Sequence, residues 1–238
     1  MATSSGHTIK AFDEDLDRLR ALISQMGGQA EHAIRESLRC LVQHDLDGAA
    51  KVVEDDKKLD ALEVETEQRA VQLIALRAPM AADLRDVVAA MKISGVVERI
   101  GDYAKNIAKR VSTLEDSKIR PLSLLPEMAR IAGEMVQNVL DAFAARDPKK
   151  AAEVCDRDSA VDDFYNSIFR ALLTHMMENP HNITPATHLL FVAKNLERIG
   201  DHATNVAEMV YFAATGEHLA DRAKGADVTG IGASDLGA

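Results

Sequence analysis

The chain has 238 residues, of which 47% are hydrophobic and only 4% aromatic. This length suits one large domain or two small ones, and the apolar fraction is ample for a core. The formal net charge is −10, and no run of Lys and Arg supplies the clustered basic face that a phosphate backbone requires. We therefore expect no nucleic-acid partner; the acidity suits cations or a basic protein surface.

Six helical stretches are expected in chain order. Apolar residues recur at three- and four-residue spacing from Phe12 onward, and strand-like alternation of useful length is absent from the sequence. Turn and capping residues separate the stretches, as at Asp45 and Pro79. The expected stretches are about 13–44, 47–76, 81–114, 124–145, 149–178 and 184–215.

Short connections make sequential helices pack antiparallel. The fold class expected is therefore all-α, a tandem repeat of two antiparallel three-helix bundles. Residues 7–115 form the first unit, 122–216 the second, and 217–238 a disordered tail rich in Gly. Helices of about 30 residues are roughly 45 Å long, so the molecule should be elongated.

One motif occurs twice, 99 positions apart. Residues 98–108 (ERIGDYAKNIA) and 197–207 (ERIGDHATNVA) are identical at eight of eleven positions. Each copy places a Glu and an Asp four residues apart, on one face of a helix: Glu98 with Asp102, and Glu197 with Asp201. A helical wheel puts this acidic row, with Ser94, Asn106 and Asn205, opposite the apolar side, so we expect it to face outward.

A second acidic pair precedes each motif: Asp56 with Asp60, and Asp158 with Asp162. In an antiparallel hairpin, Asp60 and Glu98 come to nearly the same height on either side of the Pro79 turn. Four carboxylates could thus converge in each unit, and such oxygen ligands suit Mg²⁺, Mn²⁺, Ca²⁺ or oxidised iron. The simpler interpretation is a solvated acidic face on which Arg99 pairs with Asp102 and Arg198 with Asp201.

Gly101 and Gly200 lie inside the repeated motif. Gly in a helix interior costs roughly 1 kcal/mol relative to Ala, so its presence needs a reason. We expect close approach of a neighbouring helix at both positions.

Signatures of enzymes are missing from the sequence. It has no Gly-rich phosphate loop, no nucleophile elbow and no His-Glu-x-x-His. Cys40 and Cys155 are read as buried apolar residues, and neither a signal pattern nor a membrane-length apolar run is present. We expect a non-enzymatic cytoplasmic protein without an organic cofactor.

A tandem pair of three-helix units, with Glu-Arg-Ile-Gly-Asp on the last helix of each, resembles the PhoU family of phosphate-signalling regulators. The opening agrees, with His7 followed by Phe12-Asp13-Glu14-Asp15-Leu16, as do Met26 and the Asp56/Asp60 pair. The resemblance runs from about residue 7 to residue 216. PhoU-like domains associated with phosphate carriers share parts of the motif.

The resemblance implies a dimeric cytoplasmic adaptor that represses phosphate uptake and the phosphate-starvation (Pho regulon) response. Its implied partners are the ATPase subunit of the phosphate ABC transporter and the sensor histidine kinase, so it meets the membrane only through proteins. Some family members carry iron clusters on this motif, which implies metal ligation by eight residues here. These are Asp56, Asp60, Glu98, Asp102, Asp158, Asp162, Glu197 and Asp201. Arg99, Asn106, Arg198 and Asn205 are the expected partner-binding residues.

Two alternatives stay open at this point. One is a helical metalloprotein that oxidises or stores iron on the duplicated carboxylates. The other is a plain helical scaffold with solvated acidic faces.

Overall fold

A computed structural model describes residues 4–114 and 123–219 of the chain. The first unit consists of three long helices and a short 3-10 helix. They are α1 (Ser4–Gln43), α2 (Leu46–Arg77), α3 (Ala82–Ala108) and η1 (Ser112–Leu114).

The second unit repeats this plan with one interruption. It comprises α4 (Leu124–Ala145), α5 (Pro148–Asp156), α6 (Asp158–Glu178), η2 (Pro180–Asn182) and α7 (Ile183–Thr215). The expected all-α tandem repeat is confirmed, and none of the described helices is long and apolar enough to cross a membrane.

Three expected boundaries were wrong. The stretch expected at 149–178 is divided at Arg157, whose N–H bonds to the carbonyl of Val154, three residues back, at 3.1 Å. This tightened turn interrupts the helix without changing the apolar period, so the sequence does not reveal it. The third helix ends at Ala108 rather than near residue 114, and the first begins at Ser4 rather than near residue 13. Most of the expected linker at 115–123, and the expected tail from residue 220 onward, lie outside the described residues.

The first turns of the two units are built alike. His44 and Arg146 adopt left-handed backbone conformations with φ of 55° and 52°. The next residue caps the following helix in each case: Asp45 accepts the N–H of Gly48 at 2.8 Å, and Asp147 accepts that of Lys149 at 2.9 Å. The units therefore correspond at an offset of 102 residues through the first two helices.

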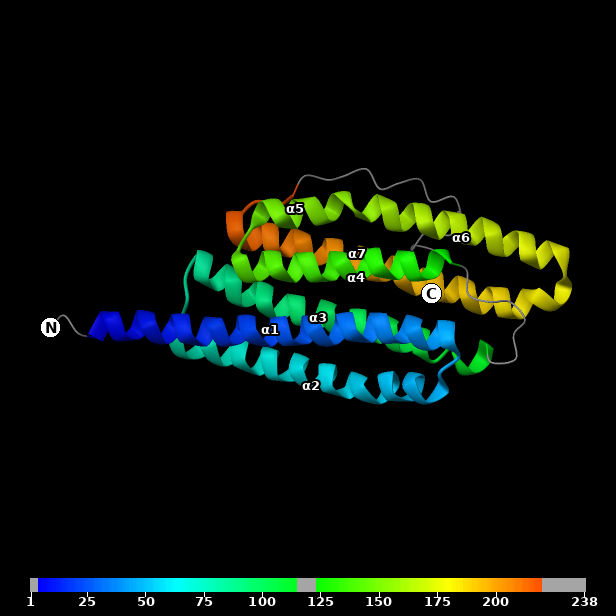
Figure 1. The fold of residues 1–238 in the computed structure, drawn as a ribbon. Helices are drawn as coiled ribbons and strands as arrows, with labels where there is room; N and C mark the ends of the chain where they lie inside the picture. Colours follow the sequence, from blue (N-terminus) through cyan, green and yellow to red (C-terminus); the bar gives the residue numbers. More distant parts are fainter. Residues whose placement is uncertain (1–3, 115–122, 220–238) are drawn as a thin grey trace, which may run out of the picture.

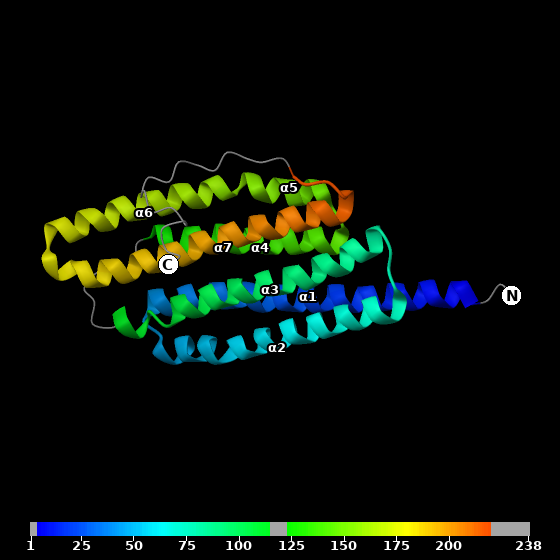
Figure 2. The same ribbon diagram turned by 180° about the vertical axis from the view of Figure 1, so that it is seen from behind.

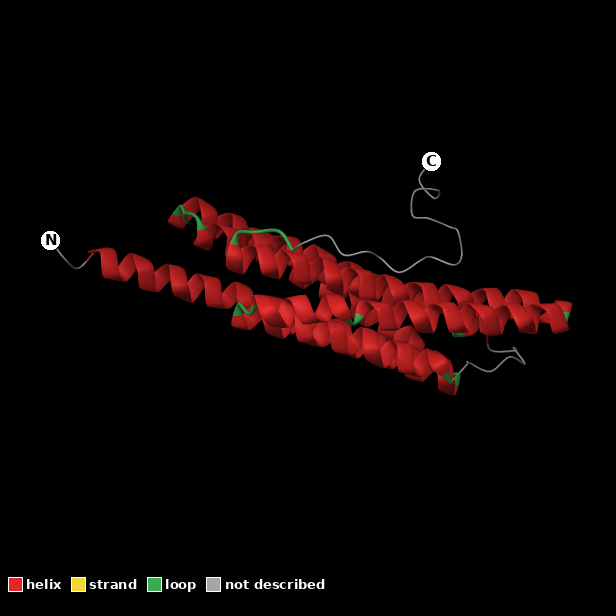
Figure 3. Cartoon of the chain, turned by 90° about the horizontal axis from the view of Figure 1, so that it is seen from above, coloured by secondary structure: helices red, strands yellow, loops and turns green. Residues whose placement is uncertain are grey.

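The two bundles lie side by side along their length and give an elongated molecule (Figures 1 and 2). Helix α3 packs against α7, and α1 packs against α4, so the buried residues of both units form one continuous core. The view from above shows the long helices nearly aligned (Figure 3).

An approximate twofold relation links α3 and α7. Tyr103 and His202 occupy equivalent motif positions, 99 residues apart, and their rings meet edge to face with centroids 5.2 Å apart. The helices run antiparallel, because Arg85 of α3 reaches the carbonyl of Ala213 while Arg110, just beyond α3, contacts His188. The two motif copies consequently meet near the middle of the molecule.

Asp86 connects three parts of the fold. It lies near the start of α3 and is 3% exposed. Its carboxylate accepts a hydrogen bond from Arg20 of α1 at 3.2 Å and pairs with Arg146, after α4, at 3.1 Å. Burial raises the pKa of Asp86, and the two guanidinium groups oppose that rise. This network joins the first bundle to the second.

Replacing Asp86 by Ala should leave two arginines without their shared acceptor. Both are partly exposed and can regain water, so we expect the free energy of unfolding to fall by about 2 kcal/mol. Urea denaturation measures this loss, with the exposed Asp83→Ala as the control. Equal stability of the two variants would contradict the role given to Asp86.

Candidate functional site

The first unit brings its four expected carboxylates together in the seam between α2 and α3. Asp102, Asp60 and Asp56 all act on Glu98 by charge repulsion. Lys105 of α3 donates to Asp56 at 2.5 Å and also to Asp102, so its ammonium group bridges the two helices. The four carboxylates therefore converge in the first unit, as expected from the similar distances of Asp60 and Glu98 to the Pro79 turn.

Sequence reasoning missed two members of this cluster. Glu63 of α2 repels Glu98, and a Cβ placed on Gly95 would lie 3.2 Å from Oε1 of Glu63. Burial acts to lower the pKa of Lys105, but its hydrogen bonds to Asp102 and Asp56 outweigh burial and raise that pKa. The three-residue spacing from Asp102 to Lys105 is a signal that could have identified this lysine.

Glu98 has the most perturbed carboxyl group of the cluster. Burial, followed by repulsion from Asp102 and Glu63, raises the pKa of Glu98 to about 7. The Glu98 carboxyl is thus poised between its neutral and charged forms near neutral pH. Burial and repulsion from Asp56 raise the pKa of Asp60 as well.

The second cluster lies in the seam between α6 and α7. Glu197 has a side chain that is 15% exposed, and it accepts a hydrogen bond from Lys194 at 2.8 Å. Burial raises the pKa of Glu197; the Lys194 hydrogen bond lowers it, and repulsion from Asp201 and Asp162 raises it further. The other carboxylate oxygen of Glu197 is buried and has no hydrogen-bond partner among the described residues.

The motif glycines set how closely these helices approach. A Cβ on Gly101 would lie 2.2 Å from Leu59 of α2, and one on Gly200 would lie 3.1 Å from an oxygen of Asp158. Close approach of a neighbouring helix, expected from the sequence, is confirmed at both positions. It also brings Asp56 and Asp158 against the motif helices.

The outward orientation expected for the whole acidic row was wrong in part. Ser94 is fully buried, and Glu98 and Glu197 are only partly exposed, because the row packs against a second neighbouring helix. Asn106 and Asn205 are exposed as expected. Because each motif helix packs against more than one neighbouring helix, Glu98 and Glu197 are not fully solvated.

The conformation of the clusters does not match a metal centre. No group of three or more His, Cys, Asp or Glu side chains within residues 4–114 and 123–219 is arranged to hold a metal ion. In the first unit a cation would have to displace Lys105, which already binds Asp56 and Asp102. Metal ligation by the eight carboxylates stays a prediction.

The arginines of the motif lie near the contact between the two units. Burial lowers the pKa of His202, and the charges of both Arg99 and Arg198 lower it further, whereas Asp201 raises it. Arg99 is exposed and Arg198 half-buried. Asp102 pairs with Lys105 rather than with Arg99, the partner that the sequence suggested.

Gly101→Ala tests the close approach in the first seam. The added methyl must displace the buried Leu59, so we expect a net loss of about 1 to 2 kcal/mol of unfolding free energy despite the better helix propensity of Ala. Gly133→Ala is the matched control, because a Cβ there has no neighbour within 4 Å, and it should gain up to about 1 kcal/mol. Stabilisation by both substitutions in thermal or urea denaturation would refute the tight seam.

Glu98→Gln tests the perturbed carboxyl. The pKa of Glu98 in the folded state lies above the ordinary value of 4.5, so wild-type stability should fall as pH rises from about 4.5 through about 7. Gln stays neutral, and the variant should lack this fall and be more stable above that window by about 1 kcal/mol after allowance for solvent screening. Parallel pH-stability profiles for the two proteins would contradict the shift.

Comparison with known proteins finds a match to each of the two units. The PhoU domain matches residues 23–111 and again residues 125–210. A "Phosphate-specific transport system accessory protein PhoU homolog" from Zymomonas mobilis is 58% identical over 228 residues, covering 95% of this chain and 96% of the relative. The homolog of the same description from Rhizobium meliloti is 49% identical and covers 90% of this chain and 91% of its own.

Solved structures agree with the sequence relatives. The crystal structure of PhoU from Pseudomonas aeruginosa superimposes with a TM-score of 0.82 at 34% identity, over 87% of this chain and all (100%) of that one. The phosphate transport system regulatory protein PhoU from Streptococcus pneumoniae gives the same TM-score of 0.82 at 25% identity, over 88% and 99%. The chain belongs to the PhoU family.

Proposed function

We propose that the chain is a cytoplasmic regulator that represses phosphate uptake and the phosphate-starvation response when phosphate is plentiful. Its partners are the ATPase subunit of the phosphate ABC transporter and the sensor histidine kinase. One observation carries the proposal. Proteins described as accessory to a phosphate-specific transport system are 58% and 49% identical to this chain over 95% and 90% of its length.

The architecture supports an adaptor that acts by binding. One core joins both units, and the network of Asp86 ties them together, so the molecule can present surfaces at fixed separation. In each seam a lysine pairs with carboxylates, Lys105 with Asp56 and Asp102 and Lys194 with Glu197, which supports a structural and electrostatic role for the seams. The protein acts without turnover chemistry.

The region where the two motif copies meet is the proposed partner surface. It carries Arg99 and Arg198 near the crossing of α3 and α7, with Asn106 and Asn205 exposed farther along the same helices. Guanidinium groups bind carboxylates bidentately, which suits acidic patches on partner proteins. Two copies of the chain form the functional homodimer.

Deleting the gene should derepress phosphate-starvation genes in phosphate-rich medium, as measured by a reporter for those genes. Arg99→Glu combined with Arg198→Glu should reproduce this phenotype with the protein folded and present, because charge reversal repels an acidic partner by several kcal/mol. Normal repression in the deletion strain would overturn the proposed function.

The matched control reverses one exposed arginine in each unit away from the motif, Arg69→Glu with Arg170→Glu. Repression should persist in this control. Pull-down from native extract with each variant separates loss of the transporter ATPase from loss of the kinase. Equal loss of repression in the control would remove the motif surface as the partner site.

A further inference from the structure

Helix α2 presents a row of uncharged, mostly apolar residues to solvent. The row has the alternating three- and four-residue spacing that lets one helix pack along another. Its members, which we call the α2 stripe, are all exposed: Ala61, Val64, Gln68, Val71 and Ala75. Val64 is 51% exposed and Val71 59%, and Val is a poorer helix former than Glu, Lys or Gln. Helix stability alone therefore does not explain the two valines.

None of the described helices covers the α2 stripe. Helix α2 lies at the outer edge of the molecule, with α1 and α3 on its inner side (Figures 1 and 2). Its buried residues, such as Leu59, Leu62 and Leu73, belong to the core of the first unit. A helical wheel places these leucines on the face opposite the stripe. The helix thus has two faces suited to packing, and its own bundle fills one of them.

Carboxylates border the α2 stripe on both sides. A helical wheel places Asp60 and Glu67 along one border and Glu54 and Glu65 along the other. Glu65 pairs with Arg69 at 2.8 Å. The other three make no salt bridge within 4.0 Å to another residue of the described chain. The stripe is therefore an uncharged row inside a negatively charged frame.

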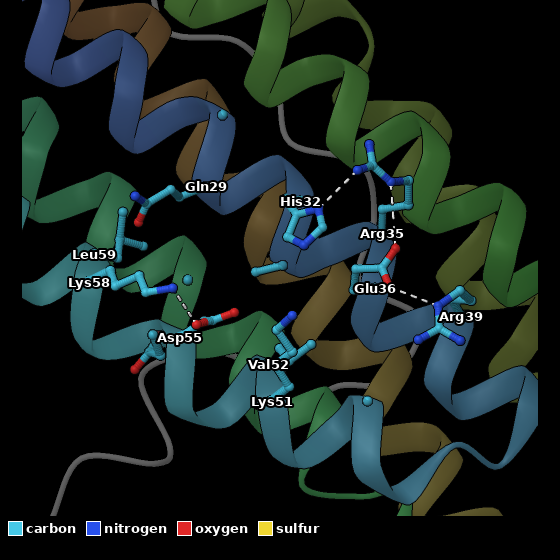
Figure 4. Close-up of a pocket in the computed structure, with 15 residues that line it drawn as sticks. Gln29, His32, Arg35, Glu36, Arg39, Lys51, Val52, Asp55, Lys58 and Leu59 are labelled. Carbon is cyan, nitrogen blue, oxygen red and sulfur yellow. Dashed lines mark hydrogen bonds and ion pairs between the residues drawn. The ribbon is translucent and has the colours of Figure 1, made fainter.

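The side of α2 that faces α1 is electrically different. A groove of about 710 Å³ lies between these two helices, and Figure 4 shows charged side chains paired along it. Asp55 pairs with Lys58 at 2.6 Å, and Glu36 of α1 pairs with Arg39 at 2.8 Å. These carboxylates hold cations of their own, whereas three of the four that border the stripe do not.

The second unit does not repeat the stripe. At the offset of 102 residues, Asp163, Asn166 and Arg170 occupy its first three positions, and Leu173 and Met177 occupy the last two. Charged and amide side chains thus interrupt the row on α6. The uncharged row is a feature of the first unit and is not required by the fold that both units share.

We propose that the α2 stripe binds an amphipathic helix of a partner protein, one whose narrow apolar seam is bordered by Lys and Arg. The alanines of the stripe permit close approach, the valines supply apolar contact, and the carboxylates on both borders favour basic flanks. A second copy of this chain fits less well, because its own stripe would bring the same carboxylates against these.

This inference rests on the proposed function and gives the regulator a second partner surface. The arginines of the motif suit an acidic patch, whereas the α2 stripe suits a basic helix, so the two surfaces select different partners. The stripe spans residues 61–75, about 21 Å of helix. A single helix face of this length is smaller than the interface of a stable complex, and we expect a transient one.

Fluorescence anisotropy of a labelled peptide with the purified full chain tests the proposal. The peptide has about 21 residues in heptads, with Leu and Ala along its seam and Lys on both borders. A scrambled peptide has the same composition and charge without the seam. We expect the patterned peptide to bind at least about tenfold more tightly, because general attraction by the acidic chain acts on both peptides equally.

Val64→Gln with Val71→Gln removes the apolar contact without a change of charge. Both positions are exposed, so the variant should fold. It should bind the patterned peptide about tenfold more weakly than the wild type. Leu173→Gln with Met177→Gln is the matched control, because it removes two exposed apolar side chains from the second unit, and it should leave binding unchanged.

A separate pair of variants tests the border charges. Glu65→Gln with Glu67→Gln should weaken binding of the patterned peptide and reduce its dependence on salt, because fewer charges then attract the lysines. Glu153→Gln with Glu208→Gln makes the same change of charge at exposed positions in the second unit and should do neither.

Three results would each overturn the proposal: no binding of either peptide, equal binding of the two, or unchanged binding in Val64→Gln with Val71→Gln. Loss of self-association by that variant in sedimentation equilibrium would also overturn it, because the stripe would then belong to a second copy. These measurements use purified protein, so their failure is distinct from normal repression in the deletion strain.

Discussion

The close contact of each motif helix with its neighbour is the constraint on which the rest of the structure depends. Gly101 lets α3 reach Leu59 of α2, and Gly200 lets α7 reach Asp158 at the start of α6. Because the helices touch there, Asp56 and Glu98 lose much of their contact with water, although the side chain of Asp102 stays 40% exposed. Their charge must then be shared with a lysine or reduced by protonation, as Lys105 and Glu98 do in the first seam.

Duplication explains much of the architecture, and divergence explains the differences. Tyr103 and His202 meet at equivalent positions, so the twofold relation lies close to the motif itself. Each seam contains a lysine, but from different places: Lys105 aligns with Thr204, and Lys194 aligns with Gly95. The need for a positive charge in the seam is thus common to both units, although the residue that meets it is not.

The sequence predicted the helical repeat and the meeting of the carboxylates, because both follow from helical periodicity and from equal distances to the Pro79 turn. It did not predict the break at Arg157, since apolar spacing continues through it. Burial of Ser94 was missed because a wheel shows one core side, whereas α3 packs on more than one neighbour.

The seam between α2 and α3 is tight enough to remove much of the water from around Glu98. Titration of the Glu98 side-chain carboxyl carbon by NMR measures this most directly. We expect a midpoint close to the pKa of about 7 that follows from burial and repulsion by neighbouring carboxylates. A midpoint near the ordinary value of 4.5 would show a solvated carboxylate and contradict the account.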